Sequence, residues 1–166
     1  MSDIVSARLV LRPINAEEVA AVLNGQRQPG WAADFPAEGD QVIAGLLARA
    51  GLPAGDRARR FGHRLVVERD TGTVVGGVGF FGPPQDGEVE IGYGIVPSRQ
   101  RRGYATEAVQ AMVADILQTD GVQTVTAHVD LDNPASIRVL EKSGMTLCTQ
   151  NQEQATYHMR RSPQRR

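Results

Sequence analysis

Residues 88–105 read Glu-Val-Glu-Ile-Gly-Tyr-Gly-Ile-Val-Pro-Ser-Arg-Gln-Arg-Arg-Gly-Tyr-Ala and carry the clearest pattern in the chain. Residues 88–95 alternate between apolar positions and polar or glycine positions, which is typical of a half-buried strand. The loop that follows, up to Gly103, is rich in arginine. After it, apolar residues recur at helical spacing from Ala105 to Leu117. The sequence therefore predicts a strand, a basic loop and an amphipathic helix in direct succession.

The start of that helix has the properties of an anion-binding site. Backbone N–H groups in the first turn of a helix lack an intrahelical partner, and the helix dipole is positive there. A diphosphate can accept hydrogen bonds from these groups directly. Gly103 allows the backbone to come close to a ligand, and Arg99, Arg101 and Arg102 can add charge-assisted hydrogen bonds. The alternative is an exposed basic loop that only caps the helix.

The rest of the chain predicts hairpins with helices inserted between the strands. Further strands are expected at 8–13, 64–69, 73–81, 122–130, 145–149 and 155–160. Further helices are expected at 15–23 with Asn15 as cap, at 40–50 with Asp40 as cap, and at 134–143. This order indicates an α+β fold with a mixed sheet. No linker divides the sequence, so we expect one domain over residues 1–166 with a loose tail at 162–166.

Composition excludes several classes of protein. The 166 residues include 18 Lys and Arg against 19 Asp and Glu, for a net charge of −1, which argues against a general nucleic-acid binder. The single cysteine, Cys148, excludes an internal disulfide framework and a thiolate-rich zinc site. No apolar run reaches the roughly 20 residues of a membrane helix, and no hydrophobic segment follows Met1. We therefore expect a cytoplasmic protein without a membrane partner.

Two other patterns indicate little. The series Gly77-Val-Gly-Phe-Phe-Gly82 matches a dinucleotide-binding motif, but two prolines follow where a helix should begin. The three histidines lie on separate predicted strands without the spacing of metal ligands: His63, His128 and His158. No metal site is expected.

Two blocks of the sequence resemble motifs of the GCN5-related N-acetyltransferase (GNAT) superfamily. Gln100-Arg-Arg-Gly-Tyr-Ala105 resembles the Gln/Arg-x-x-Gly-x-Gly/Ala segment that binds the pyrophosphate of acetyl-CoA, and residues 132–145 resemble the segment after the fifth strand. The opening 7–13 and Glu90-Ile-Gly-Tyr93 are similar to the branch that acetylates ribosomal-protein alanine. The resemblance extends from Arg8 to about Met145. It implies the GNAT fold, a twisted mixed sheet of six or seven strands flanked by about four helices.

The resemblance also implies an activity and a binding site. The protein would transfer an acetyl group from acetyl-CoA to a primary amine, on a protein N-terminus or a small molecule, by direct attack in a ternary complex. The pantetheine arm would lie like an added strand where the fourth and fifth strands separate. The residues implied in acetyl-CoA binding are Ile95, Val96, Arg101, Arg102, Gly103, Tyr104, Ala105, Thr106 and Asn133.

Acetyl transfer to an amine needs a base, since only the neutral amine attacks the thioester. Glu90 is the candidate base and Glu88 the reserve; the alternative for both is a solvated glutamate on a half-buried strand. Ser136 is the candidate acid, although a serine near a helix start also bonds backbone. Many members of the superfamily have a tyrosine where this chain has Leu140, which leaves the acid open.

The acceptor is expected to contact residues 24–40 and the final strands. In the early loop, Trp31 and Phe35 are either core residues or part of a wall around the acceptor. A second hypothesis is a non-catalytic regulatory module that binds acyl-CoA, and Leu140 favours it. A third, weaker one is an RNA-associated module that uses Arg101, Arg102 and the tail 160–166. A homodimer is left open, and a nucleic-acid partner is not expected.

Overall fold

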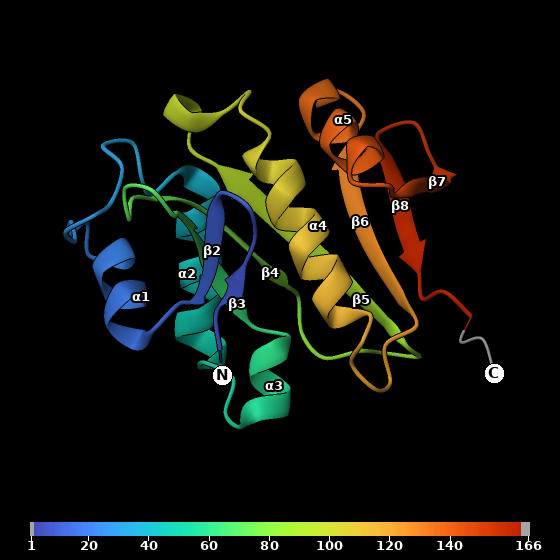
Figure 1. Cartoon of the computed structure of the whole chain (residues 1–166), viewed down its shortest axis with the longest axis horizontal. Coiled ribbons are helices and arrows are strands. Elements are labelled where there is room, and N and C mark those ends of the chain that lie inside the picture. The colour runs from blue at the N-terminus through green and yellow to red at the C-terminus, as the bar shows by residue number, and fades with distance from the viewer. Residues whose placement is uncertain (1, 164–166) are drawn as a thin grey trace.

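The computed structural model describes residues 2–163, and its centre is one sheet of eight strands (Figure 1). The strand order is β1-β2-β3-β4-β5-β6-β8-β7. The bounds are Ile4–Val5 (β1), Leu9–Pro13 (β2), His63–Glu68 (β3), Val74–Phe80 (β4), Glu88–Ile95 (β5), Thr124–Asp130 (β6), Thr146–Gln150 (β7) and Gln154–Arg160 (β8). Neighbouring strands are antiparallel except β5 and β6, which are parallel. The predicted α+β class with a mixed sheet is confirmed, and the short β1 adds a strand that the sequence did not indicate.

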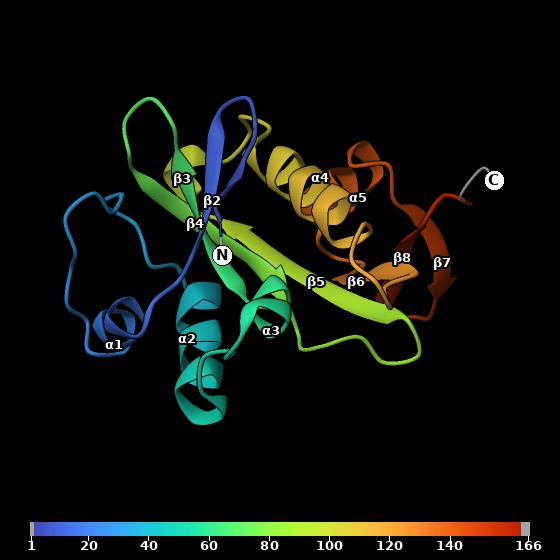
Figure 2. The ribbon, with the colours of Figure 1, turned by 60° about the horizontal axis from the view of Figure 1, so that its bottom comes forward.

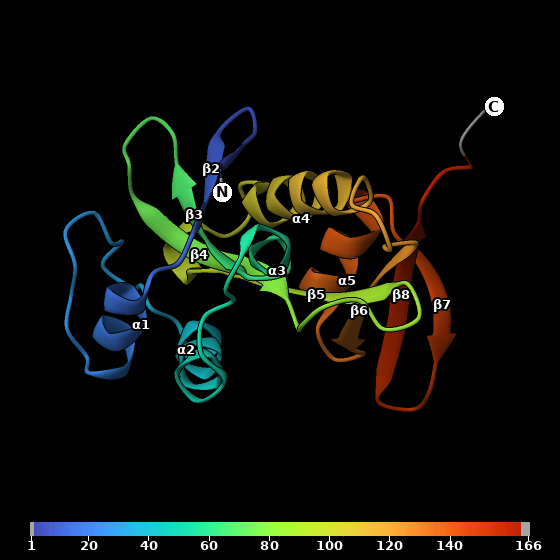
Figure 3. The same cartoon turned by 90° about the horizontal axis from the view of Figure 1, so that it is seen from below.

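The described residues also form five α-helices, one more than expected. They are Ala16–Leu23 (α1), Glu38–Ala50 (α2), Asp56–Arg60 (α3), Tyr104–Ile116 (α4) and Pro134–Lys142 (α5), and Pro97–Arg99 forms a 3-10 turn (η1). Helix α4 crosses one face of the central strands, and α1 and α2 lie on the other face (Figures 2 and 3). The buried side of α4 consists of Ala108, Val109, Met112, Val113 and Ile116. The apolar periodicity predicted for this helix therefore forms part of the core.

Two helix starts show how local sequence sets the boundaries. Asn15 caps α1 as predicted, because its side chain accepts from the Glu18 N–H at 2.8 Å and the Glu18 carboxylate accepts from the Asn15 N–H at 3.0 Å. Asp40, predicted as the cap of the next helix, instead lies inside α2. Its carboxylate accepts from the N–H of Ala37, the N-cap residue, at 3.0 Å. Asp40 therefore still satisfies a backbone N–H at the start of α2, but it does so from the third position of the helix and not as the N-cap residue.

The early loop is held by its own side chains. Trp31 and Phe35 are buried and meet edge to face at 4.9 Å between ring centroids. Arg27 donates to the carbonyls of Ala32 at 2.7 Å and Phe35 at 2.9 Å. Of the two interpretations of Trp31 and Phe35, the structure supports the core. Helix α3 lies in a segment predicted as loop, because its residues, Asp-Arg-Ala-Arg-Arg, lack an apolar period.

Strands β4 and β5 approach each other closely through glycine. Gly77 and Gly79 of β4 stand opposite Gly94 and Gly92 of β5. A Cβ at Gly76 would collide with the carbonyl oxygen of Gly94, so β4 requires glycine at position 76. At Gly94, by contrast, a Cβ would meet open space. The centre of the sheet therefore has little side-chain cover on one side of β5.

Two findings concern only residues 2–163. No helix there combines the length and apolar character needed to cross a bilayer. That part of the chain also holds no group of three or more His, Cys, Asp or Glu side chains placed to bind a metal ion. The end of the predicted tail, residues 164–166, lies outside the described residues.

Candidate active site

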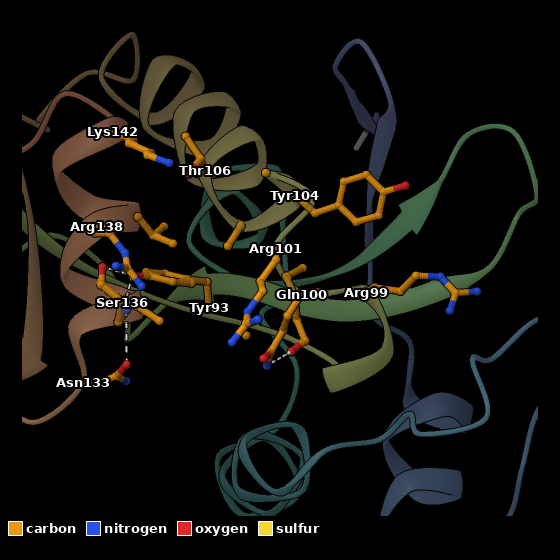
Figure 4. A pocket seen from close by; sticks show the side chains of 16 residues that line it. Tyr93, Arg99, Gln100, Arg101, Tyr104, Thr106, Asn133, Ser136, Arg138 and Lys142 are labelled. Atoms are coloured by element: carbon orange, nitrogen blue, oxygen red, sulfur yellow. Dashed lines mark hydrogen bonds between the residues drawn. The ribbon is translucent and has the colours of Figure 1, made fainter.

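A cleft of about 590 Å³ lies between the end of β5, the start of α4 and one side of α5 (Figure 4). The predicted site residues that line it are Ile95, Arg101, Gly103, Tyr104, Ala105, Thr106, Asn133 and Ser136. Val96, Arg102 and Glu90 are not among the lining residues. Fold and sequence thus bring the basic loop and the start of α5 to one site, although they are about thirty positions apart.

The start of α4 presents unpaired donors to this cleft. Gly103 is the N-cap residue with a φ of 82°, and Arg101 has a φ of 63°, so the loop turns twice through left-handed backbone. Within the described residues, no side chain caps this helix. The first-turn N–H groups and the positive end of the dipole are therefore available to an anion.

Arg8 joins the basic loop to the first turn of α4. Its Nε donates to Glu107 Oε1 at 2.8 Å, and its Nη1 donates to the carbonyl of Arg102 at 2.8 Å. The guanidinium also lies 4.8 Å from the ring centroid of Tyr104. The Arg102 carbonyl is therefore fixed by Arg8, and Arg102 is not among the residues that line the cleft. Its predicted contact with a ligand has no support in the cleft lining.

Glu68 of β3 gives the loop a second support. It accepts from the Tyr104 hydroxyl at 2.8 Å and from Arg99 Nε at 3.4 Å. Burial alone would raise the pKa of Glu68, but hydrogen bonds from Tyr104, Thr71 and Arg99 outweigh it and hold the pKa below its ordinary value. The carboxylate therefore stays charged and restrains Arg99.

The early loop is fastened to the same region. The Ser98 N–H and Oγ each donate to the Asp34 carboxylate at 2.7 Å. These two bonds hold the pKa of Asp34 below its ordinary value. Residues 24–40, expected to contact the acceptor, are thus joined through Asp34 to η1, which leads into the basic loop.

One edge of β5 faces the cleft with its backbone groups. β6 pairs with β5 only at Glu88, Val89 and Glu90, and the two strands then separate. The Phe81 N–H donates to the carbonyl of Glu90, and the Val96 N–H donates to that of Val75. Backbone groups alternate between the two edges of a strand. Those of Ile91, Tyr93 and Ile95 therefore point to the edge that β6 has left.

This alternation separates the two strand residues predicted to hold a pantetheine arm. Ile95 lies on the open edge, and its carbonyl accepts from Gln100 Nε2 at 2.9 Å. Val96 is fully buried; its N–H donates to Val75, and its carbonyl accepts from the Arg99 N–H at 3.0 Å. Both backbone groups of Val96 are occupied, so the geometry favours Tyr93 in its place.

Tyr93 and Ser136 meet inside the cleft (Figure 4). The Tyr93 hydroxyl lies 2.7 Å from Ser136 Oγ, and Asn133 caps α5 by accepting from the Ser136 N–H at 3.2 Å. Burial raises the pKa of Tyr93, so the phenol stays neutral. Leu140 is fully buried in the core. Sequence reasoning missed Tyr93 by counting it with the apolar side of β5; a hydroxyl among aliphatic residues was the available signal.

Two basic residues of α5 complete the lining. Arg138 and Lys142 lie on the cleft side of that helix (Figure 4). Sequence reasoning missed these two residues because the motif of this segment is recognised by its serine and glycine positions. Neither Arg138 nor Lys142 occupies a position of the motif.

Glu90 lies at the point where β5 and β6 separate. Its carboxylate is 3.1 Å from Nε2 of His128, and its side chain is 35% exposed. Glu88 is exposed two residues earlier. Beside Glu90, the Phe81 ring covers Gly92 and is itself half exposed.

The face of β4 away from α4 carries a pair of partly buried ionisable groups. A Cβ at Gly77 would meet His63 Nε2 and Asp40 Oδ1, so both side chains pack on this glycine. Burial raises the pKa of Asp40 to about 6, although the Ala37 N–H opposes the shift. Burial lowers the pKa of His63 to about 4. The two shifts therefore leave both groups mainly neutral between about pH 4 and 6.

Comparison with known proteins agrees with this geometry. Residues 8–146 match the acetyltransferase (GNAT) domain family. The uncharacterized N-acetyltransferase YoaA of Bacillus subtilis (strain 168) is 30% identical over 142 residues, which cover 82% of this chain and 78% of that protein. The uncharacterized N-acetyltransferase YjdG of the same strain is 37% identical over 107 residues, 64% of this chain, and the match spans 62% of YjdG.

Solved structures show the same fold. A GNAT-family acetyltransferase from Bacillus anthracis gives a TM-score of 0.67 at 18% identity, covering 96% of this chain and 99% of that one. RimL, a ribosomal L7/L12 alpha-N-protein acetyltransferase in complex with coenzyme A, gives 0.64 at 20% identity, covering 96% and 98%. These likenesses confirm the expected fold and do not distinguish a branch. Since the family match also covers most of the sequence, the protein belongs to the GNAT family of acetyltransferases.

Proposed function

We propose that the protein is an N-acetyltransferase that uses acetyl-CoA as donor and a primary amine as acceptor, in a ternary complex. The observation that carries the proposal is the continuous cleft from the uncapped start of α4 to the open edge of β5. Its first part suits a diphosphate, and its second suits an extended arm with amide groups, which can pair as an added strand does. Coenzyme A joins both chemistries in one molecule.

The residues present fit this donor. The N–H groups of residues 104–106 and the Arg101 side chain face the place of a diphosphate. The backbone groups of Tyr93 and Ile95 lie along the path of the arm. When bound, acetyl-CoA supplies the activated acyl group. The chain's own task is then to orient that group, supply a neutral amine and stabilise charge.

Glu90 is the base in this proposal. An acceptor arrives as an ammonium ion, and its proton passes to the Glu90 carboxylate, directly or through one water, leaving a neutral amine and a carboxylic acid. The position of Glu90 at the separation of β5 and β6 supports this role, because an arm lying along the open edge would end there.

Ser136 has a different task from the one expected of an acid. An ordinary thiol has a pKa of about 8.5, whereas phenols begin at about 10, so a thiolate does not take a proton from Tyr93 or from an alcohol at equilibrium. The Ser136 hydroxyl, oriented by Tyr93, instead donates a hydrogen bond to the departing sulfur. The attacking nitrogen releases its second proton as the amide forms, and this proton neutralises the thiolate. The Glu90 carboxylic acid then gives its proton to water, which restores the carboxylate for the next cycle.

A regulatory module that binds acyl-CoA without turnover is the second candidate. The burial of Leu140 favours it, because no phenol stands at that position of α5. Tyr93 weakens this argument for the regulator, because its phenol reaches the cleft from β5. The two candidates differ in one measurement, the release of free thiol from acetyl-CoA.

The deciding experiment is a panel of amine acceptors assayed by thiol release. Enzymes of one fold differ in acceptor. A chimera of the spermidine N-acetyltransferase SpeG has a TM-score of 0.67 to this chain at 14% identity, and the match covers 93% of this chain and 96% of that one. The panel therefore contains polyamines and peptides with free N-termini. Release with any of them supports the enzyme, whereas tight acetyl-CoA binding without release on all of them supports the regulator.

Gly103→Glu tests donor binding alone. A carboxylate at the start of α4 would repel a diphosphate, so we expect acetyl-CoA affinity to fall at least tenfold in titration calorimetry, a loss of about 1.4 kcal/mol or more. Gly103→Ala is the matched control, because it carries the same left-handed strain without charge. Equal affinity in the two variants would remove the diphosphate site from the start of α4.

A further inference from the structure

Glu90 has a partner that the proposed reaction does not use. Nε2 of His128 lies 3.1 Å from Glu90 Oε1. Glu90 is the last residue of β5 paired with β6, opposite Thr126, and His128 stands two residues beyond Thr126 on β6. The contact therefore spans the point at which the two strands begin to separate.

The other nitrogen of the imidazole is also held. Nδ1 of His128 lies 2.9 Å from Oγ1 of Thr156, the residue paired with His128 on β8. A threonine hydroxyl can donate as well as accept. When it donates to Nδ1, the neutral ring carries its proton on Nε2 and donates that proton to Glu90. The three side chains then form one line of hydrogen bonds across β8, β6 and β5.

Other ionisable groups on this face stand apart from the imidazole. Glu88 precedes Glu90 by two residues on β5, and His158 is paired with Thr126 on β8. Asp130 follows His128 by two residues on β6, and its Oδ1 accepts from Gln154 Nε2 at 3.0 Å. In residues 2–163, none of these three groups is hydrogen-bonded to His128. Among these ionisable groups, only Glu90 contacts the His128 imidazole.

We propose that His128 is a positioning residue that sets the orientation of the Glu90 base, which rests on the role of Glu90 proposed above. The neutral ring holds Oε1 through Nε2–H and leaves Oε2 for the acceptor ammonium.

The test compares three variants by thiol release at one pH above the range in which imidazoles ordinarily change charge, which is about pH 5 to 8. His128→Phe removes the donor, and we expect kcat to fall about tenfold, with the KM for acetyl-CoA unchanged. His128→Gln keeps an N–H donor and should restore most of kcat, because its amide can hold Glu90 Oε1 as the imidazole does. His158→Gln is the control, because His158 lies on the same face and has no contact with Glu90. It should leave kcat and the KM for acetyl-CoA unchanged.

The outcomes separate this inference from the function on which it rests. If Glu90→Gln is slow while His128→Phe matches the His158→Gln control, the positioning role is overturned and the base remains. If Glu90→Gln keeps the full rate, the base itself is removed from the mechanism.

A second readout needs no turnover. The ¹⁵N chemical shifts of the His128 ring should show the Nε2-protonated tautomer, because the Glu90 carboxylate accepts at that nitrogen. A ring protonated on Nδ1 alone overturns the inference whatever the kinetics show.

Discussion

At the end of β5, the Tyr93 hydroxyl lies 2.7 Å from Ser136 Oγ, while Leu140 on the same helix as Ser136 is fully buried. The helix thus contributes the serine, and the strand contributes the phenol that orients it. Ser136 and Glu90 could be chosen from sequence because each lies in a recognisable local motif. Tyr93 and His128 could not be assigned, because their partners lie on other elements and are set by strand pairing and helix docking.

A double-mutant cycle tests the Tyr93 and Ser136 pair. A neutral hydrogen bond contributes about 0.5–1.5 kcal/mol, so Tyr93→Phe and Ser136→Ala should each lower kcat by about 2- to 13-fold. Because one hydroxyl acts through the other, the double variant should be little slower than the slower single variant. Thiol-release kinetics measure the rates, and acetyl-CoA affinity should stay within about twofold. Independent, multiplicative losses would show that the two hydroxyls act separately.

Among the elements, β5 and α4 were predictable because each carries its own period, alternation in one and helical spacing in the other. The helix α3 and the strand β1 were not, since five and two residues are too short for a period. Val96 shows a different limit. Sequence reasoning identified the strand end, but the edge that each backbone group faces depends on the register with β4.

The close approach of β4 and β5 makes an element-scale prediction. Gly76→Ala would place a Cβ against the Gly94 carbonyl, so the strands must shift, and we expect a loss of about 1–3 kcal/mol in the free energy of unfolding. Gly45→Ala in α2 is the matched control, because a Cβ there meets open space. It should stabilise the protein by about 0.5–1 kcal/mol. Urea denaturation measures both, and a neutral Gly76→Ala would show that β4 has room.

At the scale of the whole molecule, the two faces of the sheet have separate tasks. The face under α4 and α5 builds the cleft, while on the other face the partly buried Asp40 and His63 pack on Gly77. The order of the elements predicted the fold class, and the residues before α4 predicted an anion-binding site at the start of that helix. They could not predict that Asp34 and Ser98 join the early loop to η1, since those residues are 64 positions apart.

Asp40 and His63 make opposite contributions to stability as pH changes. Between about pH 4 and 6, the folded protein keeps a proton on Asp40 that the unfolded chain loses, so this term weakens folding as pH rises. Over the same range, the unfolded chain keeps a proton on His63 that the folded protein lacks, so this term strengthens folding as pH rises. The two terms largely cancel in the natural sequence.

Removing either group should reveal the other. Relative to the natural sequence, His63→Gln should lose stability as pH rises from about 4 to 6, and Asp40→Asn should gain it, each by about 1 kcal/mol per pH unit. Urea denaturation at several pH values measures both slopes. Slopes of the same sign in the two variants would contradict the assignment.

The separation of β5 from β6 has a consequence for how this molecule behaves in a crowded solution. A bare strand edge on the rim of a sheet invites another polypeptide to add itself and so begin aggregation. Here the bare edge is interior to the sheet, with β6 still joined at one end and α5 standing over the gap. The open edge of β5 therefore has room for a single extended ligand but is not accessible to the edge strand of another molecule's sheet.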